Sequence, residues 1–294
     1  MRSSKLSIRQ LAEMKRRGEK IVMVTAYDAP GARLAEAAGI DLLLVGDSAA
    51  MVMLGHDSTL PVTLEEMLLL TQAVTRVARR ALVVGDLPFG SYQVSDEAAV
   101  ASAVRLTKDG GADIVKIEVA GARVARAEAI VGAGIPVMGH IGLTPQSATL
   151  LGGYRAQGRS AVEALALVEA ARALEAVGCC AVVLEAIPAA VAAHITERLT
   201  IPTIGIGAGA GCDGQVLVWH DLLGLGEGAP PRFVRPYADL AGTIAHALAA
   251  YADDVRSGRF PDESHEYGMP REEQTRFEEW LATHEHPGPR RSGR

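Results

Sequence analysis

Eight short apolar runs alternate along this chain with longer Ala-rich segments, and this alternation constrains the fold more than any other feature. Most of the runs are continuously apolar, which is typical of strands buried on both faces of a parallel sheet. We therefore predict strands at Ile21–Thr25, Leu42–Val45, Leu82–Val84, Ile114–Ile117, Val137–Met138, Ala181–Leu184, Thr203–Ile206 and Val216–Val218.

The segments between these runs carry helical spacing and helix boundary signals. Thr63 is followed three residues later by Glu66, which is a capping-box pattern, and Gly39 and Gly178 mark helix ends. The sequence predicts helices at Ala29–Ala38, Leu64–Arg79, Asp96–Lys108, Val124–Val131, Ala161–Ala176 and Ala189–Leu199, followed by Tyr237–Val255 and Glu272–His284.

Strands and helices in this order predict an α/β fold, specifically a closed (β/α)8 TIM barrel. The chain has 294 residues, and barrels of this kind typically need about 250. A doubly wound open sheet is the alternative, because alternation alone does not determine whether the sheet closes. We expect a single barrel domain with N-terminal and C-terminal helices over residues 1–267. Residues 268–294 are expected to form a polar, partly disordered extension.

Composition excludes several classes of protein. Lys and Arg total 29 against 35 Asp and Glu, so the chain has no excess of positive charge with which to bind nucleic acid. No apolar run reaches the length of about 18 residues that a membrane span requires. The charged N-terminal segment does not resemble a secretory signal, and three cysteines do not make a disulfide framework. We therefore expect a cytoplasmic protein without a nucleic-acid or membrane partner.

Carboxylates gather where the predicted strands end. Asp47 and Asp86 follow the second and third runs, and Glu118 follows the fourth. In a parallel barrel, side chains at the C-terminal ends of the strands converge on one face. Converging buried carboxylates repel one another unless a cation lies among them, and hard oxygen ligands suit Mg²⁺. The alternative is that each acid caps the following helix or pairs with an arginine.

Three other ionisable residues lie at or near strand ends. Lys116 precedes Glu118 by two residues, so both side chains share one face of a strand. The lysine can hold a substrate carboxylate, form a Schiff base or simply pair with Glu118. Glu185 follows the sixth run with no cation nearby in sequence, which favours a general base or a helix cap over a metal ligand. His140 is either a hydrogen-bond donor in the site or a buried core histidine.

The glycine-rich segment 205–210 fits the pattern G-x-G-x-x-A after a predicted strand. Taken alone, this pattern indicates a dinucleotide site. The segment comes late in the chain, however, and no βαβ unit with a properly spaced acid follows it. We interpret it as a tight loop in which the backbone approaches a ligand.

Nine short motifs follow one another between residues 25 and 209 and carry a resemblance to a known family, which covers roughly residues 5–265. They are TAYD at 25–28, LVGDS at 44–48, GHDSTLPVT at 55–63, DLPFGSY at 86–92, VKIE at 115–118, GHIGLTPQS at 139–147, GGYRAQGR at 152–159, LEAIP at 184–188 and IGIGAG at 204–209. With these motifs the chain resembles the ketopantoate hydroxymethyltransferase (3-methyl-2-oxobutanoate hydroxymethyltransferase) family. The resemblance implies a Mg²⁺-dependent (β/α)8 barrel related to phosphoenolpyruvate mutase and isocitrate lyase. It also implies a homodecamer that uses 5,10-methylenetetrahydrofolate as co-substrate.

The implied reaction belongs to pantothenate biosynthesis. It transfers a hydroxymethyl group from 5,10-methylenetetrahydrofolate to 3-methyl-2-oxobutanoate, through an enolate that Mg²⁺ stabilises, and gives 2-dehydropantoate. Two other classes stay open on the residues alone. One is another Mg²⁺-dependent lyase or mutase that forms an enolate from a 2-oxo acid without folate. The other is a non-catalytic barrel that serves as an assembly scaffold and needs no metal.

The resemblance also implies roles for the residues at the strand ends. The family's metal-binding positions match Asp47, Asp86 and Glu118. Glu185 matches the position of the proposed general base, and His140 matches a histidine near the substrate. The positions that contact the 2-oxo acid match Asp47, Ser48, Asp86 and Lys116.

Overall fold

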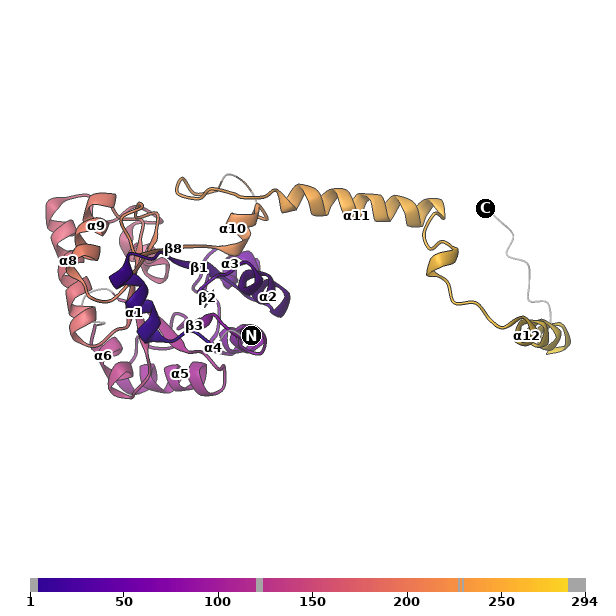
Figure 1. Cartoon of the computed structure of the whole chain (residues 1–294), viewed down its shortest axis with the longest axis horizontal. Coiled ribbons are helices and arrows are strands. Elements are labelled where there is room, and N and C mark those ends of the chain that lie inside the picture. Colours follow the sequence, from indigo (N-terminus) through magenta and orange to yellow (C-terminus); the bar gives the residue numbers. More distant parts are fainter. Residues whose placement is uncertain (1–4, 120–123, 227, 229, 285–294) are drawn as a thin grey trace. The chain divides into compact units, whose positions relative to one another are not determined.

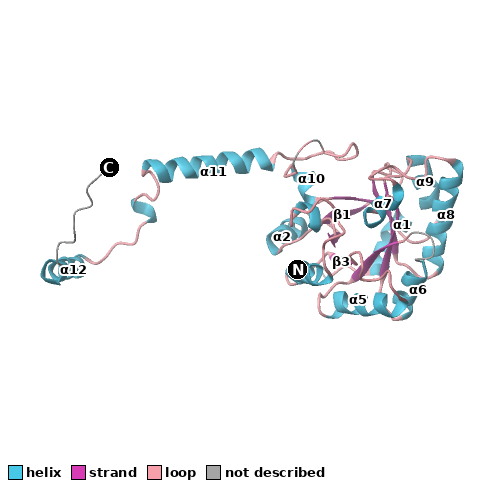
Figure 2. Cartoon of the chain, turned by 180° about the vertical axis from the view of Figure 1, so that it is seen from behind, coloured by secondary structure: helices cyan, strands magenta, loops and turns pink. Residues whose placement is uncertain are grey.

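The computed structural model describes residues 5–119, 124–226, 228 and 230–284. Within these residues, eight parallel strands close into a barrel in which each strand pairs with the next and β8 pairs with β1 (Figures 1 and 2). The predicted barrel is confirmed, and the open sheet is excluded. The strands are β1 (Ile21–Thr25), β2 (Leu42–Val45), β3 (Leu82–Asp86), β4 (Ile114–Glu118), β5 (Val137–Gly142), β6 (Ala181–Glu185), β7 (Thr203–Ile206) and β8 (Gly214–Leu217).

Several strands extend beyond the apolar runs that predicted them. β3 continues to Asp86, β4 to Glu118 and β6 to Glu185, while β8 begins earlier than expected, at Gly214. Parallel ladders are built from backbone hydrogen bonds, so a polar side chain can end the apolar run without ending the strand. As a result, three of the predicted site carboxylates are the last residues of their strands.

Helices lie on the outside of the barrel (Figure 2). α4 ends at Thr75 rather than at the predicted Arg79, because the backbone N–H groups of Arg79, Arg80 and Ala81 donate to the carboxylate of Glu36 instead. The helices of the barrel are α1 (Ile8–Arg17), α2 (Ala29–Ala37), α3 (Ala49–Val52), α4 (Leu64–Thr75), α5 (Asp96–Lys108), α6 (Val124–Gly132), α7 (Ala148–Leu151), α8 (Ala161–Ala176), α9 (Ala189–Arg198) and α10 (Trp219–Leu223), with a 3-10 turn, η2 (Pro145–Ser147).

Two apolar layers hold the barrel together. The outer layer packs the strands against the surrounding helices, and the inner layer fills the barrel with side chains such as Met23, Leu42 and Ile114. Leu11 of α1, the expected N-terminal helix, joins the inner layer and is fully buried. The inner cluster includes Ile21, Leu42, Leu82 and Ile114, the first residues of their strands, so α1 closes the end of the barrel at which the strands begin.

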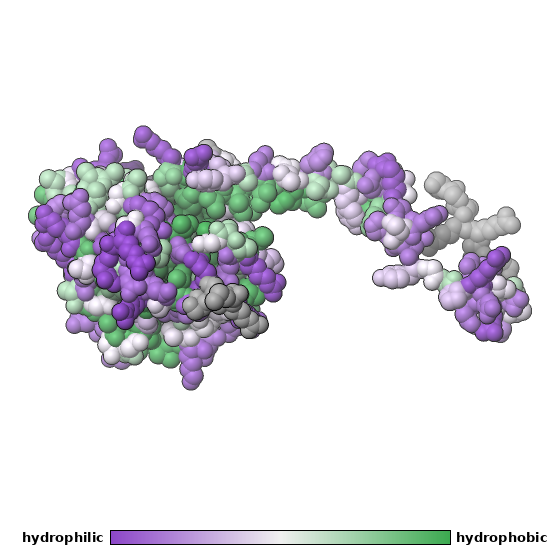
Figure 3. Space-filling model, in the orientation of Figure 1, coloured by the Kyte–Doolittle hydropathy of each residue, from purple (hydrophilic) through white to green (hydrophobic). Residues whose placement is uncertain are grey.

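The chain divides into two compact units, Met1–Leu240 and Ala241–Arg294. The second unit contains most of α11 (Leu240–Ser257), the 3-10 turn η3 (Glu263–His265) and α12 (Arg271–His284). α11 exposes apolar side chains such as Leu248 and Tyr251 along its length (Figure 3). This division, after Leu240, falls earlier in the chain than the domain boundary expected after residue 267. The expected boundary stays a prediction. The disorder expected in the extension falls partly on residues 285–294, outside the described residues.

None of the described helices is both long enough and apolar enough to cross a lipid bilayer.

Candidate active site

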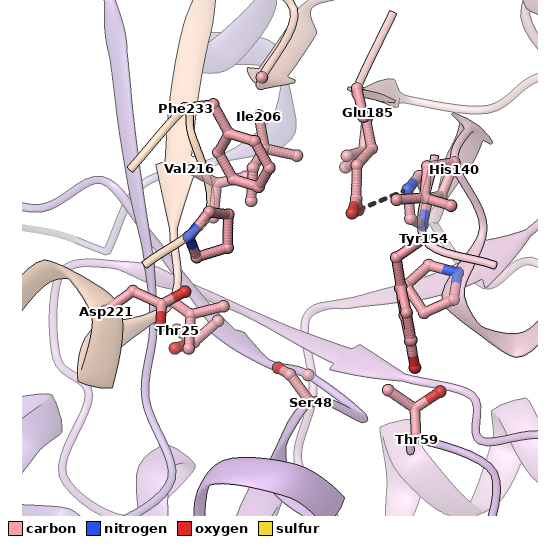
Figure 4. A pocket seen from close by; sticks show the side chains of 18 of the residues that line it. Thr25, Ser48, Thr59, His140, Tyr154, Glu185, Ile206, Val216, Asp221 and Phe233 are labelled. Carbon is pink, nitrogen blue, oxygen red and sulfur yellow. Dashed lines mark ion pairs between the residues drawn. The ribbon is translucent and has the colours of Figure 1, made fainter. Parts of the chain in front are cut away.

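A cavity of about 1100 Å³ opens at the end of the barrel where the strands finish. Pockets for a single small ligand measure roughly 300–1,000 Å³, so this cavity has room for more than one small molecule. Figure 4 shows part of its lining. The structure brings all of the site residues predicted from the sequence to this cavity, namely Asp47, Ser48, Asp86, Lys116, Glu118, His140 and Glu185.

The strands explain why these side chains meet. Asp86, Glu118 and Glu185 are the last residues of β3, β4 and β6, and Asp47 lies just beyond β2. Side chains two positions apart on a strand share a face, so Lys116 enters the cavity beside Glu118, as predicted. The roles of these residues stay predictions.

Lys116 forms a buried ion pair, and its partner is Asp86 rather than Glu118. The ammonium Nζ lies 2.7 Å from Oδ1 and 2.6 Å from Oδ2 of Asp86. Burial disfavours the charged lysine, but the carboxylates of Asp86, Asp47 and Glu118 outweigh it and raise the pKa of Lys116. A protonated lysine is not a nucleophile, so the geometry favours electrostatic binding over a Schiff base.

Burial by itself lowers the pKa of a lysine but raises the pKa of the acids in the cluster, because it disfavours the charged form of each group. It raises the pKa of Asp86 to about 7, a shift that Lys116 opposes and Asp47 increases. Glu118 is completely buried, and burial together with the charge of Asp47 raises its pKa well above the ordinary value. Its Oε2 accepts a hydrogen bond from the backbone N–H of Gln146 at 3.1 Å, whereas Oε1 has no hydrogen-bond partner among the described residues.

The carboxylates suit a hard divalent cation in chemistry, although they are not drawn together into a ligand set. Among the described residues, no three His, Cys, Asp or Glu side chains converge as metal ligands. Asp86 faces Lys116, and Asp47 accepts from the side chain of Gln146. Three buried carboxylates share one ammonium, and the unpartnered Oε1 of Glu118 leaves an anionic oxygen that a cation would satisfy. These oxygen donors fit Mg²⁺.

His140 lies between two of the acids. Its Nε2 is 3.1 Å from Oε2 of Glu185 (Figure 4). Its Nδ1 is 3.7 Å from Oε1 of Glu118. Burial, with Lys116 adding to it, lowers the pKa of His140. A neutral imidazole at this place can orient Glu185 without adding a second positive charge to the site. Of the two alternatives for His140, the site histidine is the one that the cavity supports.

The mouth of the cavity carries residues that the sequence analysis did not select. Tyr154, Arg155, Arg232 and Phe233 line it, and Tyr154 is 53% exposed. Tyr154 and Arg155 lie within one of the quoted motifs, but nothing in their spacing assigns them to the cavity. Loops supply all four, and only the folded chain brings these loops together.

The glycine-rich segment after β7 is the tight loop that the sequence predicted. Gly207 and Gly209 have positive φ angles of 64° and 79°, a conformation that favours glycine, and both line the cavity. A Cβ on Gly207 would lie 2.9 Å from the ring of Phe233. The absence of a side chain at Gly207 therefore lets Phe233 pack against this loop.

Comparison with known proteins identifies relatives along most of the chain. The family model described as ketopantoate hydroxymethyltransferase matches residues 5–263. The 3-methyl-2-oxobutanoate hydroxymethyltransferase of Oleidesulfovibrio alaskensis is 58% identical over 261 residues, which cover 88% of this chain and 90% of that protein. The enzyme of the same name from Thermobifida fusca is 56% identical, over 90% of this chain and 94% of that protein.

Solved structures with the same fold are far more distant in sequence. A phosphoenolpyruvate phosphomutase from Streptomyces platensis subsp. rosaceus is 17% identical with a TM-score of 0.57, over 95% of this chain and 99% of that chain. A 2,3-dimethylmalate lyase, described as a PEP mutase/isocitrate lyase superfamily member, is 18% identical with a TM-score of 0.56, over 94% and 99% of the two chains. These likenesses show the fold, and the much closer sequence relatives show the family. The chain thus belongs to the ketopantoate hydroxymethyltransferase family.

Proposed function

We propose that this protein transfers a hydroxymethyl group from 5,10-methylenetetrahydrofolate to 3-methyl-2-oxobutanoate and releases 2-dehydropantoate, the reaction of pantothenate biosynthesis. The observation that carries the proposal is the meeting of Lys116, Glu185 and three buried carboxylates in one cavity. Relatives above 50% identity carry the name of this enzyme, whereas the lyase and mutase of the same fold are below 20% identical. Both facts favour this reaction over the alternative of a folate-independent lyase or mutase.

The side chains present suit the binding of a 2-oxo acid. The Lys116 ammonium has three N–H donors, and its contacts with Asp86 leave donor capacity for the carboxylate of the substrate. Ser48 lines the same cavity, and its hydroxyl lies 2.9 Å from that of Tyr27, which holds it in place. Leu44, Val183 and Ile206 supply an apolar wall for the branched alkyl end of the oxo acid.

Glu185 is the base in this proposal. Its side chain lies at the cavity, beside neutral His140 and apart from the Lys116–Asp86 pair. It removes the proton from C3 of the oxo acid, and the electron pair of that C–H bond then forms the new bond to the methylene carbon. The two bonds from this carbon to folate nitrogens are replaced by one bond to C3 and one to a water oxygen. The protons from C3 and water restore both N–H groups and leave the new hydroxyl.

Asp47, Asp86 and Glu118 are the residues that would hold Mg²⁺. The metal would supply Lewis-acid polarisation of the keto group and so lower the pKa of the C3–H bond. Each unit by which that pKa falls removes about 1.4 kcal/mol from the cost of proton transfer. The buried, unpartnered oxygen of Glu118 supports this assignment.

The mouth of the cavity is the proposed place for the folate co-substrate. The exposed ring of Tyr154 and the ring of Phe233 offer flat apolar faces, and Arg155 and Arg232 offer positive charge to an acidic ligand. The size of the cavity supports a second molecule beside the oxo acid.

A direct assay tests the proposed function. The protein is incubated with 3-methyl-2-oxobutanoate, Mg²⁺ and 5,10-methylenetetrahydrofolate, and the products are identified by mass spectrometry. We expect 2-dehydropantoate to form only when all three are present. Cleavage or rearrangement of the oxo acid without folate would instead support the lyase or mutase alternative, and the absence of any turnover would contradict both.

Two further properties that the family resemblance implies are part of the proposal, namely a homodecameric assembly and a cytoplasmic location. Light scattering coupled to size-exclusion chromatography measures the mass of the assembly in solution. A mass of ten chains is expected, and a stable monomer or dimer would contradict the decamer. Fractionation of the source cells followed by immunodetection tests the location.

A further inference from the structure

Gln146 contacts two of the three carboxylates of the site. It lies in η2, in the loop that follows β5, and is buried. Its side-chain Nε2 donates to Oδ2 of Asp47 at 2.9 Å, and its backbone N–H donates to Oε2 of Glu118 at 3.1 Å. Gln146 thus donates a hydrogen bond to one carboxylate oxygen of each acid. It donates to neither of the two remaining oxygens.

The orientation of the Gln146 amide is determined by its neighbours. The hydroxyl of fully buried Tyr92 donates to Oε1 at 2.6 Å. Nε2 gives its second hydrogen to the carbonyl of Leu87 at 2.9 Å. Reversing the amide would turn its oxygen toward the carboxylate of Asp47 and the Leu87 carbonyl, which have no hydrogen to give. The amide nitrogen therefore faces Asp47.

We propose that Gln146 is a positioning residue that holds Asp47 and Glu118 so that their other oxygens are presented to a divalent cation. Tyr92 acts through Gln146 by keeping the amide in this orientation. The proposal rests on the metal site of the proposed function, and it adds a hydrogen-bonding residue that touches neither cation nor substrate. Carboxylates that bind metals are commonly oriented by such outer hydrogen bonds, and loss of one typically costs about 10–100-fold in metal affinity or activity.

The first experiment measures binding of Mn²⁺ to the full-length protein by electron paramagnetic resonance, without substrate or folate. Gln146→Met keeps the length of the side chain and the backbone N–H but removes the amide. We expect its dissociation constant for Mn²⁺ to rise by about 10–100-fold. Gln72→Met is the matched control, since Gln72 donates to the carbonyl of Asp109 outside the cavity and should leave the Mn²⁺ affinity unchanged.

Thermal unfolding measured without metal distinguishes a positioning role of Gln146 from a purely structural role in the loop. If Gln146 only stabilised the loop, Gln146→Met would lower the unfolding temperature while the folded protein kept its Mn²⁺ affinity, and that result would overturn the proposal. A wild-type protein that does not bind Mn²⁺ would instead contradict the metal site itself. The two failures are therefore distinguishable.

Tyr92→Phe provides a second, milder test if Gln146→Met does not fold. It removes the hydroxyl that orients the amide and should weaken Mn²⁺ binding less than Gln146→Met does. Where Gln146→Met does fold, the effect of Tyr92→Phe on Mn²⁺ affinity should disappear in the double variant, because Tyr92 acts through the amide that is already absent. Full additivity of the two effects, or unchanged affinity in Tyr92→Phe, would contradict the role of Tyr92.

Discussion

The two ends of the barrel interior are equally buried but differ completely in chemistry. Where the strands begin, Leu11 packs among apolar side chains, and it is 0% exposed. Where the strands finish, Glu118 is also 0% exposed and stands among Asp47, Asp86 and Lys116. Burial of the first kind stabilises the fold, whereas burial of the second kind costs free energy unless the charges are paired. In this barrel, one end is therefore built for stability and the other for chemistry.

The largest effect is expected at the polar end, from Glu185→Gln. The amide keeps the shape of the side chain but is not a base, so exchange of the C3 hydrogen of 3-methyl-2-oxobutanoate with solvent deuterium should fall by about 10²–10⁴-fold. Proton NMR of the oxo acid with Mg²⁺ in D₂O measures this exchange. Binding of Mn²⁺ and of the oxo acid should persist, because the proposal assigns Glu185 neither to the metal nor to the carboxylate of the oxo acid. Exchange at the wild-type rate would remove Glu185 as the base.

The apolar end should respond in stability rather than in activity. Leu11→Ala leaves a cavity beneath the strands and should lower the free energy of unfolding by about 2–5 kcal/mol. The folded fraction should keep its turnover number, because α1 lies at the opposite end from the site. Leu34→Ala in α2 is the control: Leu34 is 63% exposed, so a change below about 0.5 kcal/mol is expected in denaturant titrations. A loss of turnover in folded Leu11→Ala would show that the two ends are not independent.

Acidification should weaken metal binding at the polar end. Burial raises the pKa of Asp86 to about 7, so this acid takes up a proton as the pH falls through this range, and burial shifts the pKa of Glu118 in the same upward direction. A cation binds the ionised carboxylates and competes with these protons. The Mn²⁺ dissociation constant should therefore increase from pH 8 to pH 6, by up to about tenfold per pH unit for one titrating carboxylate. A constant affinity over this range would mean that the acids stay ionised without the metal.

The smallest effect is expected from removal of the chain after Tyr267. Residues 268–294 follow the segment that the family model matches, and none of the described residues of α12 is buried. A protein ending at Tyr267 should keep the turnover number and the unfolding temperature of the full chain. A marked decrease in either quantity would show that the extension contributes to the fold or the site.

Much of the fold was predictable because it depends on local patterns. The apolar runs at Ile21–Thr25, Leu42–Val45 and Thr203–Ile206 coincide with β1, β2 and β7, and the helix at Asp96–Lys108 was predicted with both of its ends. The predicted end of a helix was wrong where a distant residue takes part in the backbone hydrogen bonding. At α4, the backbone N–H of Arg79 donates to the carboxylate of Glu36, and the helix ends at Thr75. A sequence pattern carries no information about such a distant acceptor.

The strand-end residues that line the cavity were also predictable, because the last residues of all the parallel strands lie at the same end of the barrel. Asp86, Glu118 and Glu185 reach the cavity for this reason. The pairing within the site was not predictable. Pairing with Glu118, its near neighbour in sequence, was one of three alternatives for Lys116, but the lysine pairs with Asp86 on the adjacent strand.

The sequence by itself determined the alternation of strands and helices, the acids at the strand ends and the family, because these features are written in local runs and ordered motifs. Only the tertiary structure decided which charges neutralise each other, that Gln146 joins two of the acids, and that Tyr154 and Phe233 line the mouth of the cavity. Gln146 and Asp47 are 99 residues apart in the chain. Their hydrogen bond exists only because closure of the barrel brings the loops after β2 and β5 to one end.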